Sequence, residues 1–279
     1  MHLLGIEVCA QAADVLGFLA MEKIVDQCAT GISISVVSHS QIDLVAQLLG
    51  DLDAHCRDSN FELILTLNLD EALPFALDSF SYPVKLVRNA MPTGFSANHN
   101  QAFTHATGRH FCVMNPDIRL SSNPFNALLA CLEDSSVGVV APLVLDEEGE
   151  VEDSARRFPS PLKILCKVFG RCGGPDYAIN DAPIYPDWVG GMFMLFPRGI
   201  FERLGGFDER YFLYYEDVDI CGRLRLLGYE VALCPQARVA HHAQRSSHRD
   251  FRYLRWHVRS MARFFLSPVY RRLRFPPRL

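Results

Sequence analysis

Apolar residues follow two different periods between residues 31 and 145. Short β-branched or leucine-rich runs that end in polar residues predict buried strands, whereas apolar positions three to four residues apart predict helices. The predicted strands cover residues 31–40, 61–68, 84–89, 110–117 and 137–145, and the predicted helices cover 41–56, 96–108 and 124–134. This alternation predicts a largely parallel sheet with helices on both faces.

The pattern becomes less regular after residue 145. A hairpin turn is expected around Gly149, and the segment 159–186 is rich in proline and glycine and is expected to be irregular. The elements predicted beyond it are a strand over 188–197, a short helix from 198 that ends at two glycines, a helix over 217–228 and a last strand over 230–242.

These elements predict one α/β domain over 31–248, with an N-terminal extension over 1–30 and a helical tail over 249–279. The composition, 49% hydrophobic and 21% charged, is that of an ordinary globular protein. No apolar run approaches the roughly 20 residues of a membrane-spanning helix. The first 30 residues lack the basic start of a signal peptide, so we expect a cytoplasmic protein whose nine cysteines are reduced.

The charge is distributed unevenly. Nine arginines and one aspartate give the tail a charge of +8, which leaves −13 on the other residues. Four arginines recur every three or four positions among aromatic and aliphatic residues: Arg252, Arg255, Arg259 and Arg263. Such a helix either packs on the domain or lies on the anionic inner face of the plasma membrane, and we favour the membrane. The acidic body argues against a nucleic-acid partner.

Polar residues follow the predicted strands at their carboxyl ends, where ligands of parallel α/β sheets bind. They are Ser38, His39, Asn68, Asn89, Asn115, Asp117, His241 and His242. A carboxylate at Asp117 can hold Mg²⁺ or Mn²⁺, although Asn-Pro-Asp is also an ordinary turn sequence. One of the two histidines can add an imidazole ligand, or can simply reach solvent at the end of its strand.

Three acidic residues cluster in the stretch FLYYEDVDIC, which covers residues 212–221. Glu216, Asp217 and Asp219 open a predicted helix, where carboxylates interact favourably with the helix dipole. The dipole does not explain the aromatic residues that precede them. A carboxylate partly removed from water would have a raised pKa and can act as a general base, so the stretch is either a helix start or a reaction centre.

Two glycines follow a tryptophan in the segment WVGG. Gly190 and Gly191 would allow a ligand to approach the backbone closely, and Trp188 would offer an apolar face to a sugar. The same residues are equally compatible with a core tryptophan beside a bend in a strand.

Taken together, these segments resemble the family 2 inverting glycosyltransferases of the GT-A fold, in particular the bacterial rhamnosyltransferase-like branch. The resemblance covers about residues 31–265. The segments that carry it are ISISVVSHS, RNAMPTGFSANHNQAF, VMNPDIRL, SARRFPSP, PQARVAHH and the long segment from Asp187 to Glu230. It implies a Rossmann-like, mixed but mainly parallel sheet flanked by helices, a nucleotide-sugar donor and a divalent metal, Mg²⁺ or Mn²⁺.

The resemblance also implies roles for residues at the donor end. Asp117 matches the metal-binding aspartate of the family's Asp-x-Asp motif, Asn115 replaces the first aspartate, and His241 matches a second metal ligand. Ser38 and His39 lie where the first loop passes the nucleotide. Asn68 stands where the family usually has an acidic residue, which changes the expected contact to the base.

At the acceptor end, Asp217 matches the catalytic base and Glu216 would orient the acceptor. Trp188, Gly190 and Gly191 match the wall of the acceptor site. The implied reaction is a single displacement from a nucleotide sugar, with dTDP-rhamnose as the favoured donor. The expected acceptor is a glycan or lipid-linked glycan of surface polysaccharide synthesis, such as O-antigen.

Two other functions are compatible with an α/β chain of this kind. A nucleotidyltransferase would need a glycine-rich, basic phosphate loop after the first strand, and SVVSHSQIDLV contains neither glycine nor a basic Lys or Arg. A non-catalytic scaffold remains the alternative, favoured by Asn68 and by residues 1–30, and opposed by Asp117, Asp217 and His241.

Overall fold

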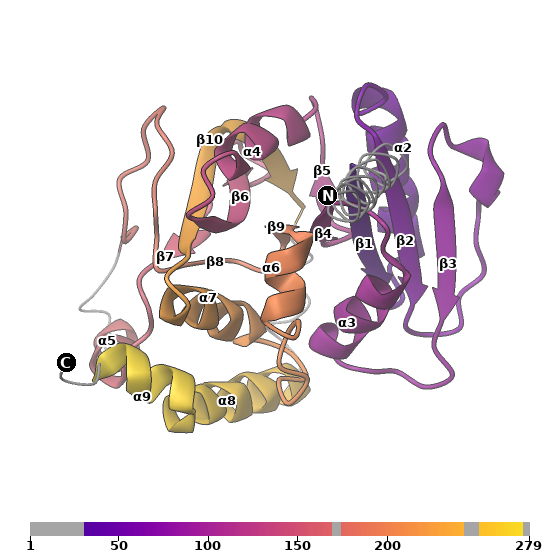
Figure 1. Cartoon of the computed structure of the whole chain (residues 1–279). Helices are drawn as coiled ribbons and strands as arrows, with labels where there is room; N and C mark the ends of the chain where they lie inside the picture. The colour runs from indigo at the N-terminus through magenta and orange to yellow at the C-terminus, as the bar shows by residue number, and fades with distance from the viewer. Residues whose placement is uncertain (1–30, 169–173, 243–250, 276–279) are drawn as a thin grey trace, which may run out of the picture.

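The computed structural model describes residues 31–168, 174–242 and 251–275 (Figure 1). The predicted extension over residues 1–30 lies outside the described residues. Eight strands form one sheet in the order β3-β2-β1-β4-β9-β6-β10-β5. Their bounds are β1 (Ile32–Ser38), β2 (Phe61–Leu67), β3 (Val84–Arg88), β4 (His110–Met114), β5 (Ile118–Arg119), β6 (Val137–Leu145), β9 (Phe193–Pro197) and β10 (Glu230–His241).

The sheet is mixed but mainly parallel, as predicted. Strands β3, β2, β1 and β4 pair in parallel, and β6 pairs in parallel with β10. Strand β9 runs antiparallel between β4 and β6, and β5 runs antiparallel to β10. Because β9 is reversed, its first residues lie at the same edge of the sheet as the carboxyl ends of its neighbours.

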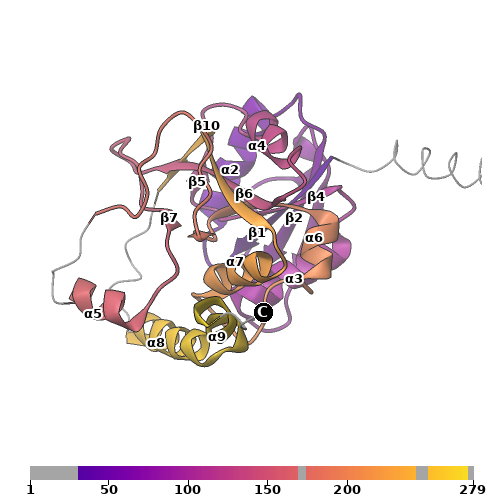
Figure 2. The ribbon, with the colours of Figure 1, turned by 60° about the vertical axis from the view of Figure 1, so that its left-hand side comes forward.

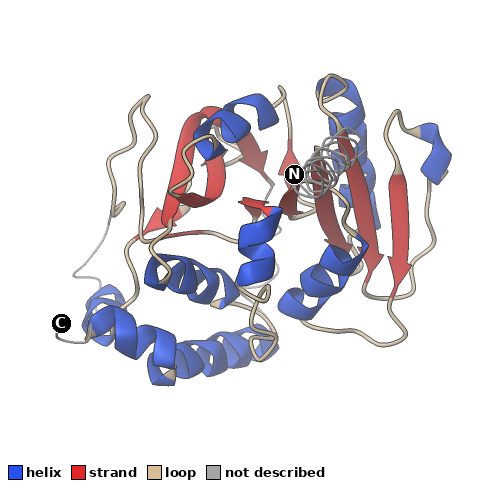
Figure 3. Ribbon diagram, in the orientation of Figure 1, coloured by secondary structure: helices blue, strands red, loops and turns tan. Residues whose placement is uncertain are grey.

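Helices cover both faces of the sheet (Figures 1 and 3). Helices α2 and α4 lie on one face, whereas α3, α6 and α7 lie on the other. Helices α8 and α9 form a further layer outside α7, as both ribbon views show (Figures 1 and 2). The bounds are α2 (Ile42–His55), α3 (Phe95–His105), α4 (Phe125–Leu132), α5 (Pro161–Val168), α6 (Arg198–Arg203), α7 (Glu216–Leu226), α8 (Phe251–Leu266) and α9 (Pro268–Arg274).

Two predictions about elements were wrong. The single strand expected over 188–197 is broken at the glycines into β8 (Trp188–Val189), which pairs with β7 (Ala155–Arg156) in a separate small sheet, and β9. The segment 159–186 contains helix α5. Ser160 starts this helix by accepting a hydrogen bond from the Lys163 N–H at 3.2 Å, and Lys163 forms an ion pair with Asp176.

The tail packs on the domain through its second half. Phe264 of α8 is fully buried, with its ring centroid 5.7 Å from that of Tyr215. In α9, Val269 and Leu273 lie against Gly222 of α7, where an added Cβ would come within 2.8 Å of Val269. Among the described residues, no helix combines the length and apolar character needed to cross a bilayer.

A buried carboxylate joins three strands of the sheet to the end of α3. Glu62 is only 3% exposed and accepts hydrogen bonds from Ser33 Oγ at 2.7 Å and from Thr107 N at 2.7 Å. It also forms a 2.7 Å ion pair with Lys85. Burial opposes its charge, but the bonds from Lys85, Ser33 and Thr107 outweigh burial and lower the pKa of Glu62.

The substitution Glu62→Gln is expected to lower the free energy of unfolding by about 1–3 kcal/mol, because hydrogen bonds to a charged group are lost. The pKa of this carboxyl is lowered on folding, so its contribution is present above its unfolded pKa and is lost as the pH falls through its folded pKa. Urea unfolding at pH 7 and at acidic pH tests this. The difference in the free energy of unfolding between Glu62→Gln and wild type should shrink in acid. The control Asp78→Asn, at an exposed carboxylate, should have the same free energy of unfolding as wild type at both pH values.

Candidate functional site

A strained turn delivers the two acidic residues at the start of α7. Tyr214 and Tyr215 both adopt the left-handed backbone region, with φ of 69° and 68°. Non-glycine residues adopt this region rarely, and such strain is concentrated at functional sites. The ring of His257 in α8 lies 5.3 Å from that of Tyr214 and 5.5 Å from that of Tyr215. The tail helix therefore supports the turn.

Asp217 is held by two backbone N–H groups. Its Oδ1 accepts from Val218 N at 2.8 Å, and its Oδ2 accepts from Gly191 N at 3.1 Å. A Cβ added at Gly191 would lie 3.7 Å from Oδ2 and 3.6 Å from Phe95, so glycine leaves the space beside the carboxylate open. The predicted base and the predicted acceptor-side glycine are thus in direct contact.

Burial sets the protonation of the acidic pair. It raises the pKa of Asp217, against the opposing effects of the Val218 and Gly191 N–H groups and of the Arg156 charge. The pKa of Glu216 is raised well above its usual range, first by burial and then by the charge of Asp217. Glu216 is 5% exposed, and its Oε2 has no hydrogen-bond partner among the described residues. Glu216 is therefore the more readily protonated member of the pair.

The predicted metal ligands lie together at the other end of the site. Asp117 follows β4, and His241 is the last residue of β10. His241 Nε2 lies 3.3 Å from Asp117 Oδ2, and its Nδ1 lies 3.0 Å from Glu152 Oε2. Burial disfavours the charged imidazole, but the two carboxylates outweigh it and raise the pKa of His241 to about 9.

These residues fit a divalent cation that is completed by its substrate. Asp117 Oδ1 is buried and has no hydrogen-bond partner among the described residues. A buried carboxylate oxygen without a donor is suited to a hard cation, and Mg²⁺ typically combines one or two carboxylates with substrate phosphates. Within the described ranges, no three His, Cys, Asp or Glu side chains converge as a complete ligand set. The rest of the coordination sphere would therefore come from the donor and water.

The backbone connects the two ends of the site. Asn115 N donates a 2.8 Å hydrogen bond to the carbonyl of Met192, which directly follows Gly191. Asn115 itself lies two residues before Asp117. The reversed direction of β9 produces this contact, because it brings the residues after β8 to the carboxyl end of β4. The acidic pair of α7 and the Asp117–His241 pair therefore face the same edge of the sheet.

Ser38, His39 and Asn68 lie together at the ends of β1 and β2. Asn68 Nδ2 lies 3.0 Å from His39 Nδ1 and donates to the Thr93 carbonyl at 3.0 Å. Its Oδ1 accepts from Asn89 Nδ2 and from Thr93 N, both at 2.8 Å. All the hydrogen-bonding capacity of this amide is thus used within the protein. Asn68 positions the loops on which His39 and Thr93 lie.

The predicted acceptor wall is built on the small sheet. Gly190 N donates to the Ser154 carbonyl at 2.9 Å, and Trp188 Nε1 donates to the Arg157 carbonyl at 3.1 Å. The Arg156 guanidinium lies 5.7 Å from the centroid of the Trp188 ring. Trp188 is half-buried and packs against the hydrophobic core.

Sequence reasoning assigned no role to three residues that the structure brings to the site. Glu152 contacts His241, and the charge of Arg156 partly opposes the rise in the pKa of Asp217. Glu71 accepts from Ser38 Oγ at 2.9 Å and from Ser40 N at 2.9 Å. Arg156 lies in SARRFPSP, one of the segments that carry the family resemblance, so its position in the sequence could have indicated a role at the site. Glu152 lies in an acidic stretch that predicted only a hairpin, and Glu71 lies in a loop without a pattern.

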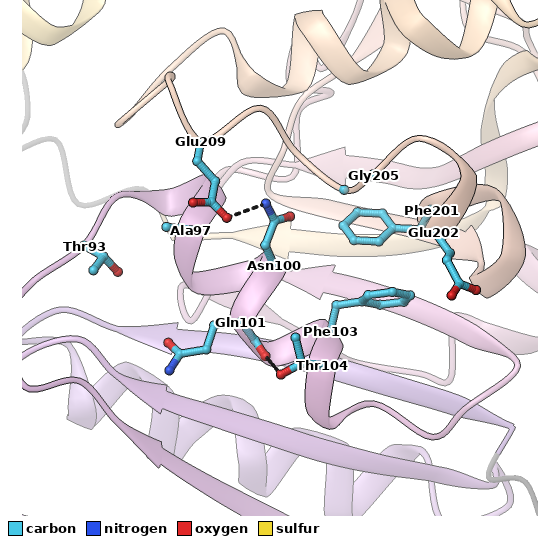
Figure 4. A pocket seen from close by; sticks show the side chains of 11 residues that line it. Thr93, Ala97, Asn100, Gln101, Phe103, Thr104, Phe201, Glu202, Gly205 and Glu209 are labelled. Carbon is cyan, nitrogen blue, oxygen red and sulfur yellow. Dashed lines mark hydrogen bonds between the residues drawn. The ribbon is translucent and has the colours of Figure 1, made fainter.

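A cavity of about 560 Å³ lies elsewhere, between α3 and the end of α6 (Figure 4). None of the predicted site residues lines it. Glu209 points toward Asn100 there, and Asn100 Nδ2 donates to Glu209 Oε1 at 3.0 Å (Figure 4). Thr93, which is hydrogen-bonded to Asn68, lines it on one side.

Comparison with known proteins points to sugar transfer. The chain is 28% identical over 245 residues to Rhamnosyltransferase WbbL of Escherichia coli K12, an alignment that covers 83% of this chain and 91% of WbbL. It is 34% identical over 148 residues to the N-acetylglucosaminyl-diphospho-decaprenol L-rhamnosyltransferase of Mycobacterium tuberculosis H37Rv. That alignment covers 50% of this chain and 48% of the mycobacterial protein, so the chain spans about half of that relative.

The fold is shared with solved glycosyltransferase structures. GalNAc-T7 with UDP, GalNAc and Mn²⁺ superimposes with a TM-score of 0.61 at 16% identity, over 77% of this chain and 44% of that one. The Pyrobaculum calidifontis mannosyltransferase PcManGT with GDP-Man and Mn²⁺ gives 0.55 at 17% identity, over 87% and 69%. The family model for glycosyl transferase family 2 matches residues 33–205. The chain therefore belongs to glycosyl transferase family 2, which confirms the resemblance seen in its sequence and identifies it as a glycosyltransferase.

Proposed function

We propose that this enzyme transfers a sugar from a nucleotide donor to a hydroxyl group of a glycan or lipid-linked acceptor, with inversion and with Asp217 as the base. The observation that carries the proposal is the Gly191–Met192–Asn115 connection. It holds Asp217 and the Asp117–His241 pair at one edge of the sheet. A single displacement requires these two functions on opposite sides of the reacting carbon.

At the donor end, Ser38, His39 and Asn115 lie beside the proposed nucleotide, and Asn68 holds the surrounding loops in place. Asp117 and His241 would hold Mg²⁺ or Mn²⁺, which when bound neutralises charge on the leaving diphosphate. Rhamnose carried by dTDP is the favoured donor, since two relatives are named rhamnosyltransferases. The O-antigen biosynthesis protein RfbC of Myxococcus xanthus is a further relative, which supports a role in surface polysaccharide synthesis.

At the acceptor end, Asp217 takes the proton of the acceptor hydroxyl as its oxygen bonds to the anomeric carbon. The bond from that carbon to the diphosphate breaks at the same time, and the diphosphate leaves with the electron pair. Glu216, protonated and buried, orients the acceptor side, and Trp188 offers its ring to the sugar. Tyr214, Tyr215 and Phe95 exclude water, which would otherwise hydrolyse the donor.

We also propose that α8 brings the enzyme to the inner face of the plasma membrane from the cytoplasm. Its described side chains leave large apolar residues exposed next to arginines, with Phe251 79%, Leu254 56% and Val258 48% exposed. A helix that combines these two features can lie at the surface of an anionic bilayer.

A donor should stabilise the protein in a metal-dependent way. Thermal shift with Mn²⁺ or Mg²⁺ and a panel of nucleotide sugars, including dTDP-rhamnose, is expected to show one donor that raises Tm by several degrees. The shift and the slow hydrolysis of that donor should disappear in Asp117→Ala and with EDTA. A folded protein that responds to no donor would instead favour the scaffold alternative.

The substitution Asp217→Asn is expected to reduce turnover by about 10²–10⁴-fold, the usual contribution of a general base, with donor affinity retained. Glu216→Gln serves as the matched variant, because an amide replaces a carboxylic acid that is already neutral. It should lose much less activity than Asp217→Asn. Steady-state kinetics with the donor identified by thermal shift makes the comparison, and equal losses in the two variants would contradict these roles.

Binding to lipid vesicles tests the membrane proposal. The wild type is expected to co-sediment with vesicles that contain anionic lipid more than with neutral vesicles, and added salt should weaken the binding. Leu254→Asn should reduce binding several-fold. Leu162→Asn, at an exposed apolar residue of α5, is the control. Equal binding to both kinds of vesicle would contradict the proposal.

A further inference from the structure

A second, basic cavity of about 410 Å³ lies between α8 and the loop that leads to α7. Three arginines line it: Arg210, Arg259 and Arg263. Its aromatic wall consists of Phe212 and Trp256, whose ring centroids are 4.9 Å apart. Nothing in the donor site described above uses these residues.

Two of the three arginines have charge to offer a ligand. Arg210 is bound to Asp208 at 2.6 Å. Arg259 is exposed and has no hydrogen-bond or ion-pair partner among the described residues. Arg263 Nε is buried and has no hydrogen-bond partner within the described ranges. A buried guanidinium N–H without an acceptor is costly, so the site is incomplete without an anion.

The neighbouring carboxylates do not supply the missing anion for Arg259 and Arg263. Asp219 is paired with Arg223 at 2.7 Å, and Asp208 is paired with Arg210. Glu209 also lines the cavity, but its carboxylate accepts from Asn100, on the side of the cavity in Figure 4. The charge of Arg259 and Arg263 is therefore uncompensated by these acids.

The cavity is coupled to the reaction centre through its wall. Ser260 of α8 donates to the Leu213 carbonyl at 2.9 Å, and Phe95 N donates to the Phe212 carbonyl at 2.9 Å. The Phe95 ring lies beside Gly191, which contacts Asp217. Phe212 precedes Asp217 by five residues, and five residues span at most about 18 Å. The cavity wall and the proposed base therefore lie on one short segment of the chain.

We infer that this cavity binds the diphosphate of a lipid-linked acceptor, with Arg259 and Arg263 as its ligands. Arginine is suited to phosphate, because its guanidinium donates paired hydrogen bonds to the phosphate oxygens. Phe212, which is 42% exposed, and Trp256 line the same cavity and provide an apolar surface beside the arginines for the start of the lipid. The inference rests on the proposed function, since it identifies the class of acceptor that presents its hydroxyl to Asp217.

Calorimetry with farnesyl diphosphate and with inorganic pyrophosphate tests the inference. Both titrations are done on the full chain in EDTA, which excludes metal-dependent binding at the donor end. Farnesyl diphosphate is expected to bind at least tenfold more tightly than pyrophosphate, and Arg259→Gln and Arg263→Gln should each weaken it about tenfold or more. Arg272→Gln, at an exposed arginine of α9, should leave the affinity unchanged.

Binding should also be unchanged in Asp117→Ala, and loss of binding there would place the anion at the donor end and overturn the inference. Equal affinities for the two probes, or unchanged affinity in Arg259→Gln, would also overturn it. Arg259 is exposed, so its variant remains informative if Arg263→Gln fails to fold. Donor-induced stabilisation is measured on the same samples. Absence of donor-induced stabilisation in the wild type would count against the proposed function, whereas absence of diphosphate binding would count against this inference alone.

Discussion

The hydrogen bond from Gly191 N to Asp217 Oδ2 is the interaction on which the arrangement of the site depends. It ties the start of α7 to the turn where the small sheet gives way to β9. The next residue, Met192, is bound in turn to Asn115, beside the Asp117–His241 pair. A short run of backbone thus sets the spacing between Asp217, the proposed base, and the Asp117–His241 pair, where the leaving diphosphate is proposed to bind. Side chains on loops alone would hold that spacing less well.

The electrostatics of the acidic pair follow from the same turn. The left-handed conformations at Tyr214 and Tyr215 place Glu216 in the interior, where burial and the charge of Asp217 raise its pKa well above the usual range. Burial also raises the pKa of Asp217, but two N–H groups and the charge of Arg156 partly offset the cost of its burial. Two adjacent carboxyl groups thereby acquire different environments, an arrangement that can separate a base from a neutral neighbour. Helix α8 of the tail helps to hold this turn, since its His257 and Phe264 pack against the turn.

Much of the fold could be predicted from the period of apolar residues, because each main strand or helix is long enough to show one. The break at Gly190–Met192 could not, since WVGGMFMLFP is apolar throughout and pairing with β7 requires a distant segment. Asp117, His241 and Asp217 could be identified because they lie in segments of a known motif. Glu152 could not, because its role depends on a contact across 89 residues of chain. Asn68 could be placed at the nucleotide end, but only the structure shows that its amide is already saturated.

The pH dependence of kcat/KM for sugar transfer tests the central claim most directly, because it reports the ionisation of the free enzyme's base. Burial raises the pKa of Asp217 above the ordinary value of 3.8, and the base must be ionised to act. The rate is therefore expected to fall as the pH drops through an apparent pKa above the ordinary aspartate range. A profile that stays flat into the ordinary aspartate range, in an enzyme that remains folded and saturated with metal, would contradict the assignment of Asp217 as the base.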